Sequence, residues 1–157
     1  MTVQGPVQLP IQVNKARKKD MRSQFGALIY RVKNDKVQIL LVTSRNTRRW
    51  IIPKGWPMLG STPAEAAAIE AWEEAGVVGK KSDRCLGVYS YYKTRSGTRN
   101  LPCLVMVYPI KAKKLKTNFP EAKERRVKWF SQKKAAKLVT EPELAKIIKS
   151  FDPKHVH

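Results

Sequence analysis

The sequence predicts an α+β domain in which helices cover both faces of a mixed β-sheet. Residues 22–33 and 37–43 are two apolar runs of strand length, separated by an Asn-Asp turn. Residues 63–75 carry the signals of a capped helix, and a second helix with an apolar face is predicted at 143–151. A chain of 157 residues suits one such domain, because a core of this size can bury about 68–70% of the unfolded surface.

The first 20 residues precede the predicted sheet and are basic, with Lys15, Arg17, Lys18 and Lys19 close together. Such a segment is usually a solvated tail, although it can also reach a bound polyanion. We therefore divide the chain into a flexible basic arm at 1–20 and a folded domain at 21–157.

The two apolar runs are expected to pair as a hairpin, because a short turn sequence separates them. The next segment, 44–49, is polar and basic. It leads into a short predicted strand at 50–52, in which Trp50 is expected to pack in the core rather than to stack on a base.

The central helix is predicted from its caps. Thr62 is a good N-cap, Pro63 suits the first helical position, and Glu65 completes a capping box. Gly76 is expected to end the helix, which should be about 20 Å long. One side is expected to lie close against the sheet because it carries small residues, namely Ala64, Ala67, Ala68, Ala71 and Ala75.

After this helix, 80–83 is predicted as a loop, and 84–93 with 99–110 as a second hairpin. Pro102 and Pro109 lack an N–H for the sheet, so the later strand is expected to lie near an edge or to contain bulges.

The last third of the chain begins with a charged stretch at 111–126. A short strand is predicted at 127–130 and a helix at 132–138, for which Ser131 is a suitable N-cap.

Three glutamates lie on one face of the central helix. Glu70, Glu73 and Glu74 are three and four residues apart, which brings their Cβ atoms to about 5–6 Å. No Lys or Arg lies between Lys54 and Lys80 to pair with them. Clustered carboxylates suit a hard divalent cation such as Mg²⁺, although a solvated acidic face would have the same sequence.

The segment 53–78 resembles the Nudix box, whose spacing holds throughout. The matching residues are Gly55, Glu70, Glu73, Glu74, Gly76 and Val77. The resemblance covers about 22–151 and implies a Nudix α/β/α sandwich. It also implies that the three glutamates bind Mg²⁺, or Mn²⁺, for hydrolysis of a diphosphate linkage.

The resemblance further implies an acidic residue outside the box that assists catalysis. Glu121 is the first choice and Glu124 the second, with a salt-bridge role as the alternative for each. Gly55 would let the loop turn beside the helix.

Two positions depart from the box. Ser61 stands where the family has a glutamate, and Ile69 stands where it has an arginine. In the family this pair supports the loop and orients the metal ligands. Losing both partners together can be nearly neutral, whereas losing one strands a charge. The alternative is an altered box without catalysis.

The chain is strongly basic, with 32 Lys and Arg against 12 Asp and Glu and a net charge of +20. This charge favours polyanionic ligands but does not choose among them. Arginine forks and lysines suit phosphates, and the candidates near the box and at the hairpin tip are Arg45, Arg48, Arg49, Lys54, Lys93 and Arg95.

Softer matches at 53–56, in the strand with Trp129 and Phe130, and in the final helix resemble the diphosphoinositol polyphosphate phosphohydrolase-like branch. The expected substrate is therefore a diphosphoinositol polyphosphate or a diadenosine polyphosphate. Two alternatives remain open, namely hydrolysis at the 5′ end of RNA and non-catalytic binding of a polyanion or nucleic acid.

The two cysteines, Cys85 and Cys103, have no metal-ligand spacing and would not face each other in the second hairpin. We expect two thiols and a reducing, cytoplasmic location. No apolar run reaches the roughly 18 residues of a membrane span, so no span is expected, and a membrane is not among the expected partners.

Overall fold

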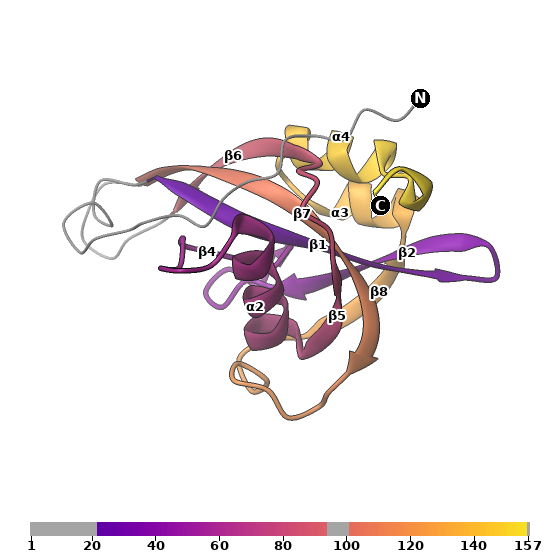
Figure 1. The fold of residues 1–157 in the computed structure, drawn as a ribbon, viewed down its shortest axis with the longest axis horizontal. Coiled ribbons are helices and arrows are strands. Elements are labelled where there is room, and N and C mark those ends of the chain that lie inside the picture. The colour runs from indigo at the N-terminus through magenta and orange to yellow at the C-terminus, as the bar shows by residue number, and fades with distance from the viewer. Residues whose placement is uncertain (1–21, 94–100, 157) are drawn as a thin grey trace.

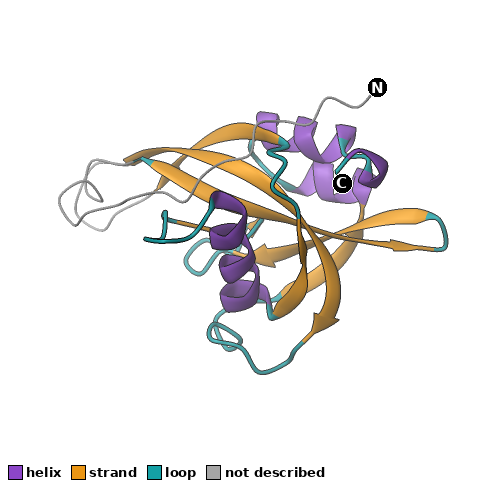
Figure 2. Ribbon diagram, viewed as in Figure 1, coloured by secondary structure: helices purple, strands orange, loops and turns teal. Residues whose placement is uncertain are grey.

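The computed structural model describes residues 22–93 and 101–156, so the predicted arm at 1–20 lies outside the described residues. One mixed sheet of eight strands lies between helix α2 on one face and helices α3 and α4 on the other (Figures 1 and 2). The predicted α+β class and the α/β/α sandwich are confirmed.

The strand order is β3-β2-β1-β7-β5, with β4 paired to β1, β6 to β7 and β8 to β2. The sheet is mixed because β1 is antiparallel to β2 but parallel to β7. The strands are β1 Ser23–Lys33, β2 Lys36–Thr43, β3 Trp50–Ile51, β4 Lys54–Gly55, β5 Val77–Lys81, β6 Gly87–Lys93, β7 Leu101–Leu115 and β8 Val127–Ser131. The helices are α2 Pro63–Ala75, α3 Gln132–Leu138 and α4 Pro142–Ser150, followed by a 3-10 turn at Pro153–His155.

Strands β1 and β2 form the predicted hairpin. Asn34 and Asp35 have φ angles of 52° and 61°, which these two residue types tolerate better than most. Alternate residues of β1 then enter two separate cores. Leu28 faces the core that contains α3 and α4, and Ile29 faces the core that contains α2.

Helix α2 has the predicted bounds and caps. The Thr62 side chain accepts a hydrogen bond from the Glu65 N–H at 3.2 Å, and the Glu65 side chain accepts from the Thr62 N–H at 2.9 Å. Gly76 ends the helix in the left-handed region with φ of 70°. The small side is slightly rotated from the prediction, because Ala66 is buried while Ala68 is only half-buried. The helix therefore lies close to the sheet, and Glu70 and Glu74 are buried along with its small residues.

The C-terminal elements also follow the sequence. Ser131 caps α3 by accepting from the Lys134 N–H. Helix α4 begins at Pro142, and its buried residues Leu144, Ile147 and Ile148 form its predicted apolar face. Trp50 packs against Phe130 with ring centroids 4.9 Å apart, so its predicted place in the core is confirmed.

Three details of the sheet differ from the first expectation. Strand β7 is not at an edge, since it pairs with β1 on one side and with β5 and β6 on the other. The alternative expectation of a bulge agrees with the register shift in the pairing of β7 with β5, opposite Val78 and Gly79. Pro109 is tolerated because it lies where β7 changes partner from β6 to β5, between the pairs at Val107 and Ile110. Lys80 and Lys81, expected in a loop, belong to β5, and β4 was not predicted at all.

Cys85 is exposed and Cys103 is buried, and the two are not joined as a disulfide, as expected. Within residues 22–93 and 101–156, no helix is long and apolar enough to cross a membrane.

Candidate active site

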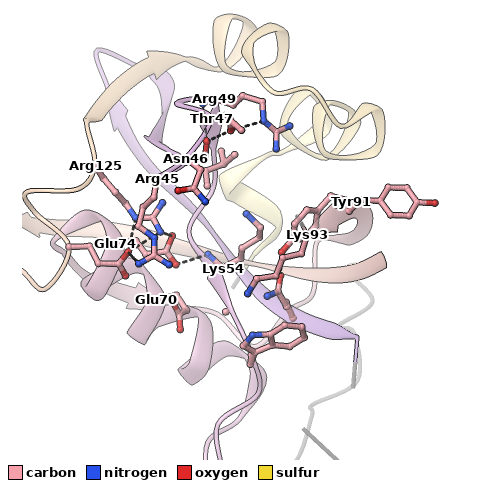
Figure 3. Close-up of a pocket in the computed structure, with 17 residues that line it drawn as sticks. Arg45, Asn46, Thr47, Arg49, Lys54, Glu70, Glu74, Tyr91, Lys93 and Arg125 are labelled. Atoms are coloured by element: carbon pink, nitrogen blue, oxygen red, sulfur yellow. Dashed lines mark hydrogen bonds and ion pairs between the residues drawn. The ribbon is translucent and has the colours of Figure 1, made fainter. Parts of the chain in front are cut away.

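A cavity of about 350 Å³ lies beside α2 and brings together most of the predicted site residues (Figure 3). One wall is acidic and the others are largely basic and aromatic. The predicted residues that line it are Arg45, Arg49, Lys54, Gly55, Glu70, Glu74, Lys93 and Glu121. Glu73 does not line this cavity, and its backbone carbonyl accepts a hydrogen bond from the Glu121 N–H at 3.0 Å.

Glu70 and Glu74 form a buried carboxyl pair. Burial raises the pKa of Glu70, and the hydrogen bond to Glu74 and the charge of Glu74 raise it further. Burial also raises the pKa of Glu74, although the bond from Glu70 and the charges of Arg125 and Lys54 oppose that shift. Glu70 is therefore the proton-holding member of the pair in the metal-free protein.

Gly55 is needed for this arrangement, but not for the reason expected. Its φ is not in the left-handed region, so no turn demands glycine there. Instead, a Cβ atom at Gly55 would overlap the carboxyl group of Glu70. Strand β4 can therefore lie against Glu70 only because residue 55 has no side chain.

Glu74 is held from two sides. Its Oε2 accepts a hydrogen bond from the backbone N–H of Lys54 at 3.2 Å, and its Oε1 lies 3.2 Å from Nη2 of Arg125. Arg125 also binds Glu121, with Nη2 2.9 Å from Oε1. Sequence reasoning missed Arg125, whose only local signal was its position four residues after Glu121.

Both glutamates outside the box form ion pairs, as the alternative reading of each proposed. Glu121 pairs with Arg125 and Arg45, whereas Glu124 pairs with Arg45 at 3.5 Å and does not line the main cavity. Of the two, only Glu121 is therefore placed to act on a ligand in the cavity.

The predicted phosphate contacts are distributed unevenly. Arg45 and Arg49 lie on the 44–49 loop, where Arg49 reaches Thr140 and Glu141. Arg48 lines a separate depression with Arg45, Asn46 and Glu124. Arg95 lies outside the described residues.

Two lysines in the cavity lie over aromatic rings. Nζ of Lys54 is 4.7 Å from the ring centre of Tyr91, and Nζ of Lys93 is 5.1 Å from that of Trp56. Burial lowers the pKa of Lys54, although the charge of Glu74 opposes this shift. The ring faces orient the two ammonium groups while leaving their positive charge available to an anion.

The sequence signal for Tyr91 was its alternation with Tyr89, which places both rings on one face of β6. The Tyr91 hydroxyl donates to Oε1 of Gln24 at 2.5 Å, which fixes the ring under Lys54. No sequence signal placed Trp56 in the cavity, because its role there depends on contact with Lys93, which is distant in the sequence.

The carboxylate oxygens of the acidic wall are suitable ligands for a hard divalent cation. A metal ion bound to Glu70 and Glu74 would replace the proton and compensate the negative charge whose burial raises both pKa values. In the described part of the chain, no group of three or more His, Cys, Asp or Glu is arranged to hold a metal. An ion here would thus depend on oxygens from substrate phosphates and water, as Mg²⁺ commonly does.

Comparison with known proteins identifies a NUDIX domain over residues 22–151. Nudix hydrolase 12, mitochondrial, of Arabidopsis thaliana is 33% identical over 108 residues, which are 66% of this chain and 53% of that protein. Human diphosphoinositol polyphosphate phosphohydrolase 3-beta is 27% identical over 132 residues, covering 83% of this chain and 76% of the relative. The aligned region spans about half the length of the Arabidopsis relatives.

Among solved structures, a C. elegans Ap4A hydrolase binary complex superimposes with a TM-score of 0.64 at 22% identity, covering 82% of this chain and 93% of that one. A NUDIX hydrolase from Nitrosomonas europaea gives a TM-score of 0.61 at 19% identity, covering 82% and 86%. These structures share the fold of the present chain.

Proposed function

The chain belongs to the Nudix family, and from this premise we propose that it is a metal-dependent pyrophosphohydrolase acting on a highly phosphorylated small molecule. A diphosphoinositol polyphosphate is the first candidate substrate. The human relative named for that activity supports this choice, together with the charge of the cavity.

The observation that carries the proposal is the way lysines cover the aromatic rings of the cavity. Lys54 lies over Tyr91 and Lys93 over Trp56, so these faces present ammonium groups rather than bare rings. Arg45 and Arg49, on the 44–49 loop, add further positive charge to the lining of the cavity. A cavity lined in this way suits many phosphates on a compact polar ring better than a stacked base.

The residues divide into two sets of roles. Glu70 and Glu74 would hold Mg²⁺, or Mn²⁺ in its place, while Glu73 stays a predicted ligand. Such an ion supplies charge neutralisation at the phosphates and a more acidic water. Lys54, Lys93, Arg45 and Arg49 would bind the phosphate oxygens and stabilise the charge that develops as the P–O bond breaks.

The test is phosphate release in Mg²⁺ from a diphosphoinositol polyphosphate, diadenosine polyphosphates and 5′-triphosphate RNA side by side. Glu74→Gln should reduce turnover by about 10³-fold or more, since it removes a metal ligand. Glu143→Gln on α4, outside the cavity, should retain activity. Absence of turnover with every substrate, in Mg²⁺ and in Mn²⁺, would contradict the proposal and favour an altered box that only binds polyanions.

A diadenosine polyphosphate is the second candidate, because one ring remains uncovered. Tyr92 lines the cavity and is 69% exposed, so a base could stack on it. If this candidate is correct, Tyr92→Ala should raise KM for diadenosine substrates and leave KM for inositol substrates unchanged.

A further inference from the structure

Arg125 lies two residues before the start of β8, and all three guanidinium nitrogens have partners. Nε lies 3.0 Å and Nη2 2.9 Å from Oε1 of Glu121. Nη1 donates to the Thr43 carbonyl at 2.9 Å, and Nη2 also contacts Glu74 at 3.2 Å. The side chain is only 7% exposed. One buried arginine thus connects the end of β2, the segment before β8 and helix α2, which carries the glutamates of the box.

Helix α2 has no basic side chain of its own to orient its carboxylates. The helix Pro63–Ala75 contains no Lys or Arg, and position 69 is an isoleucine that is 36% exposed. The side-chain cation that reaches Glu74 therefore comes from a segment distant in sequence. Together with the Lys54 N–H on the other oxygen, it fixes the direction of the carboxylate.

We propose that Arg125 is a positioning residue that holds Glu74 and Glu121 in the geometry required for metal binding and turnover. This inference rests on the proposed function for the purpose of that geometry. The planar fork is essential, because a lysine has a single ammonium group and cannot reach Thr43, Glu121 and Glu74 in the same arrangement. Loss of an outer group of this kind typically weakens metal affinity or activity by about 10–100-fold.

The sign of the effect on metal binding separates positioning from simple electrostatics. Removing a positive charge beside Glu74 should tighten cation binding if charge alone matters. Removing a positioning residue should weaken it, because Glu74 is then free to rotate. A purely structural role would lower stability without changing the metal affinity of the folded protein.

The test compares Arg125→Met and Arg125→Lys with Arg126→Met. Arg126 is a matched control, since its side chain lies over Trp50 and does not line the cavity. Mn²⁺ binding is titrated by electron paramagnetic resonance without substrate, and kcat and KM are measured separately. Hydrogen exchange at the Glu121 amide, which is bonded to the Glu73 carbonyl, reports the segment directly.

We expect Arg125→Met to bind Mn²⁺ about 10–100-fold more weakly. Its kcat should be lower, while its KM should change little. The Glu121 amide should exchange faster, Arg125→Lys should be intermediate, and Arg126→Met should match the unmodified protein. Unchanged or tighter Mn²⁺ binding by folded Arg125→Met would overturn the inference. If that variant does not fold, wild-type affinity and kcat in Arg125→Lys would overturn it instead.

Failure of the proposed function has a different signature. In that case the unmodified protein itself binds no Mn²⁺ and hydrolyses nothing. The inference is then judged by exchange at the Glu121 amide alone, and an unchanged rate in Arg125→Met would reject it.

Discussion

The two walls of the cavity are built in opposite ways. The acidic wall lies on α2 and is almost completely buried, with Glu74 only 3% exposed. The basic wall on the 44–49 loop is open, with the Arg45 and Arg49 side chains 59% and 45% exposed. Glu74 has partners on both carboxylate oxygens, whereas Arg45 makes longer contacts of 3.5 and 3.7 Å at the surface.

This difference separates a fixed element from an adaptable one. Buried carboxylates held by packing keep a single geometry, which is what metal binding and bond cleavage require. Exposed arginines can exchange a weak surface ion pair for a phosphate at little cost. The contrast predicts that small steric changes at the acidic wall are more damaging than complete removal of a side chain from the basic wall.

Of the substitutions that compare the two walls, one added methyl group at the acidic wall is expected to have the largest effect. Gly55→Ala would place its Cβ on the Glu70 carboxyl, so either β4 or Glu70 must move. Turnover should fall by about 10²-fold, and the free energy of unfolding by about 1–3 kcal/mol. Enzyme assays and urea unfolding measure both.

Gly60→Ala is the control for this substitution. Gly60 has φ of 80° but open space around its Cβ position, so alanine adds backbone strain without an overlap. It should cost about 1 kcal/mol of stability and leave turnover unchanged. Equal losses of turnover in the two variants would show that the contact with Glu70 is irrelevant.

The second prediction concerns the pH dependence of the metal-free protein. The pKa of Glu70 is raised from its ordinary value of 4.5 to about 9. Between these values the folded protein keeps a proton that the unfolded chain has released, so stability decreases as pH rises, by up to about 1.4 kcal/mol per pH unit. The stabilising contribution of the Glu70 proton is fully present below the ordinary pKa of 4.5 and is lost as the pH rises towards 9. Urea unfolding at pH 6, 7 and 8 in a chelator measures the slope.

Glu70→Gln should flatten that slope, because an amide resembles the protonated carboxyl and does not titrate. Glu143→Gln, at an exposed site on α4, should keep it. A slope that persists in Glu70→Gln would assign the titration to another group and remove the argument for a shared proton.

The local parts of this site were readable from the sequence. Thr62 and Glu65 cap α2 through contacts three residues apart, and the spacing of Glu70 and Glu74 follows from helical geometry. The loop carrying Arg45 and Arg49 was assigned to the site because it adjoins the box in the chain.

The remaining parts depend on contacts between distant segments. Arg125 reaches Glu74 only because β7 and β8 return the chain to α2, and nothing near residue 125 indicates burial. The place of β7 in the sheet could not be predicted for the same reason: its prolines are compatible with an edge or with bulges, and the change of partner at Pro109 depends on where β5 and β6 end. Glu73 matches the box by spacing, yet it lies outside the cavity in this arrangement.

The smallest effects are expected at the basic wall, where Arg45→Ala should raise KM by about 3–10-fold and leave kcat nearly unchanged. An exposed arginine contributes a modest binding energy that substrate and transition state share. Arg48→Ala is the matched control, because Arg48 is on the same loop but does not line the main cavity, so its KM should stay within about twofold. If Arg45→Ala instead lowered kcat as strongly as Gly55→Ala, the open wall would also be part of the fixed geometry. The pairing of Arg45 with Glu121 would then be the connection between the two walls.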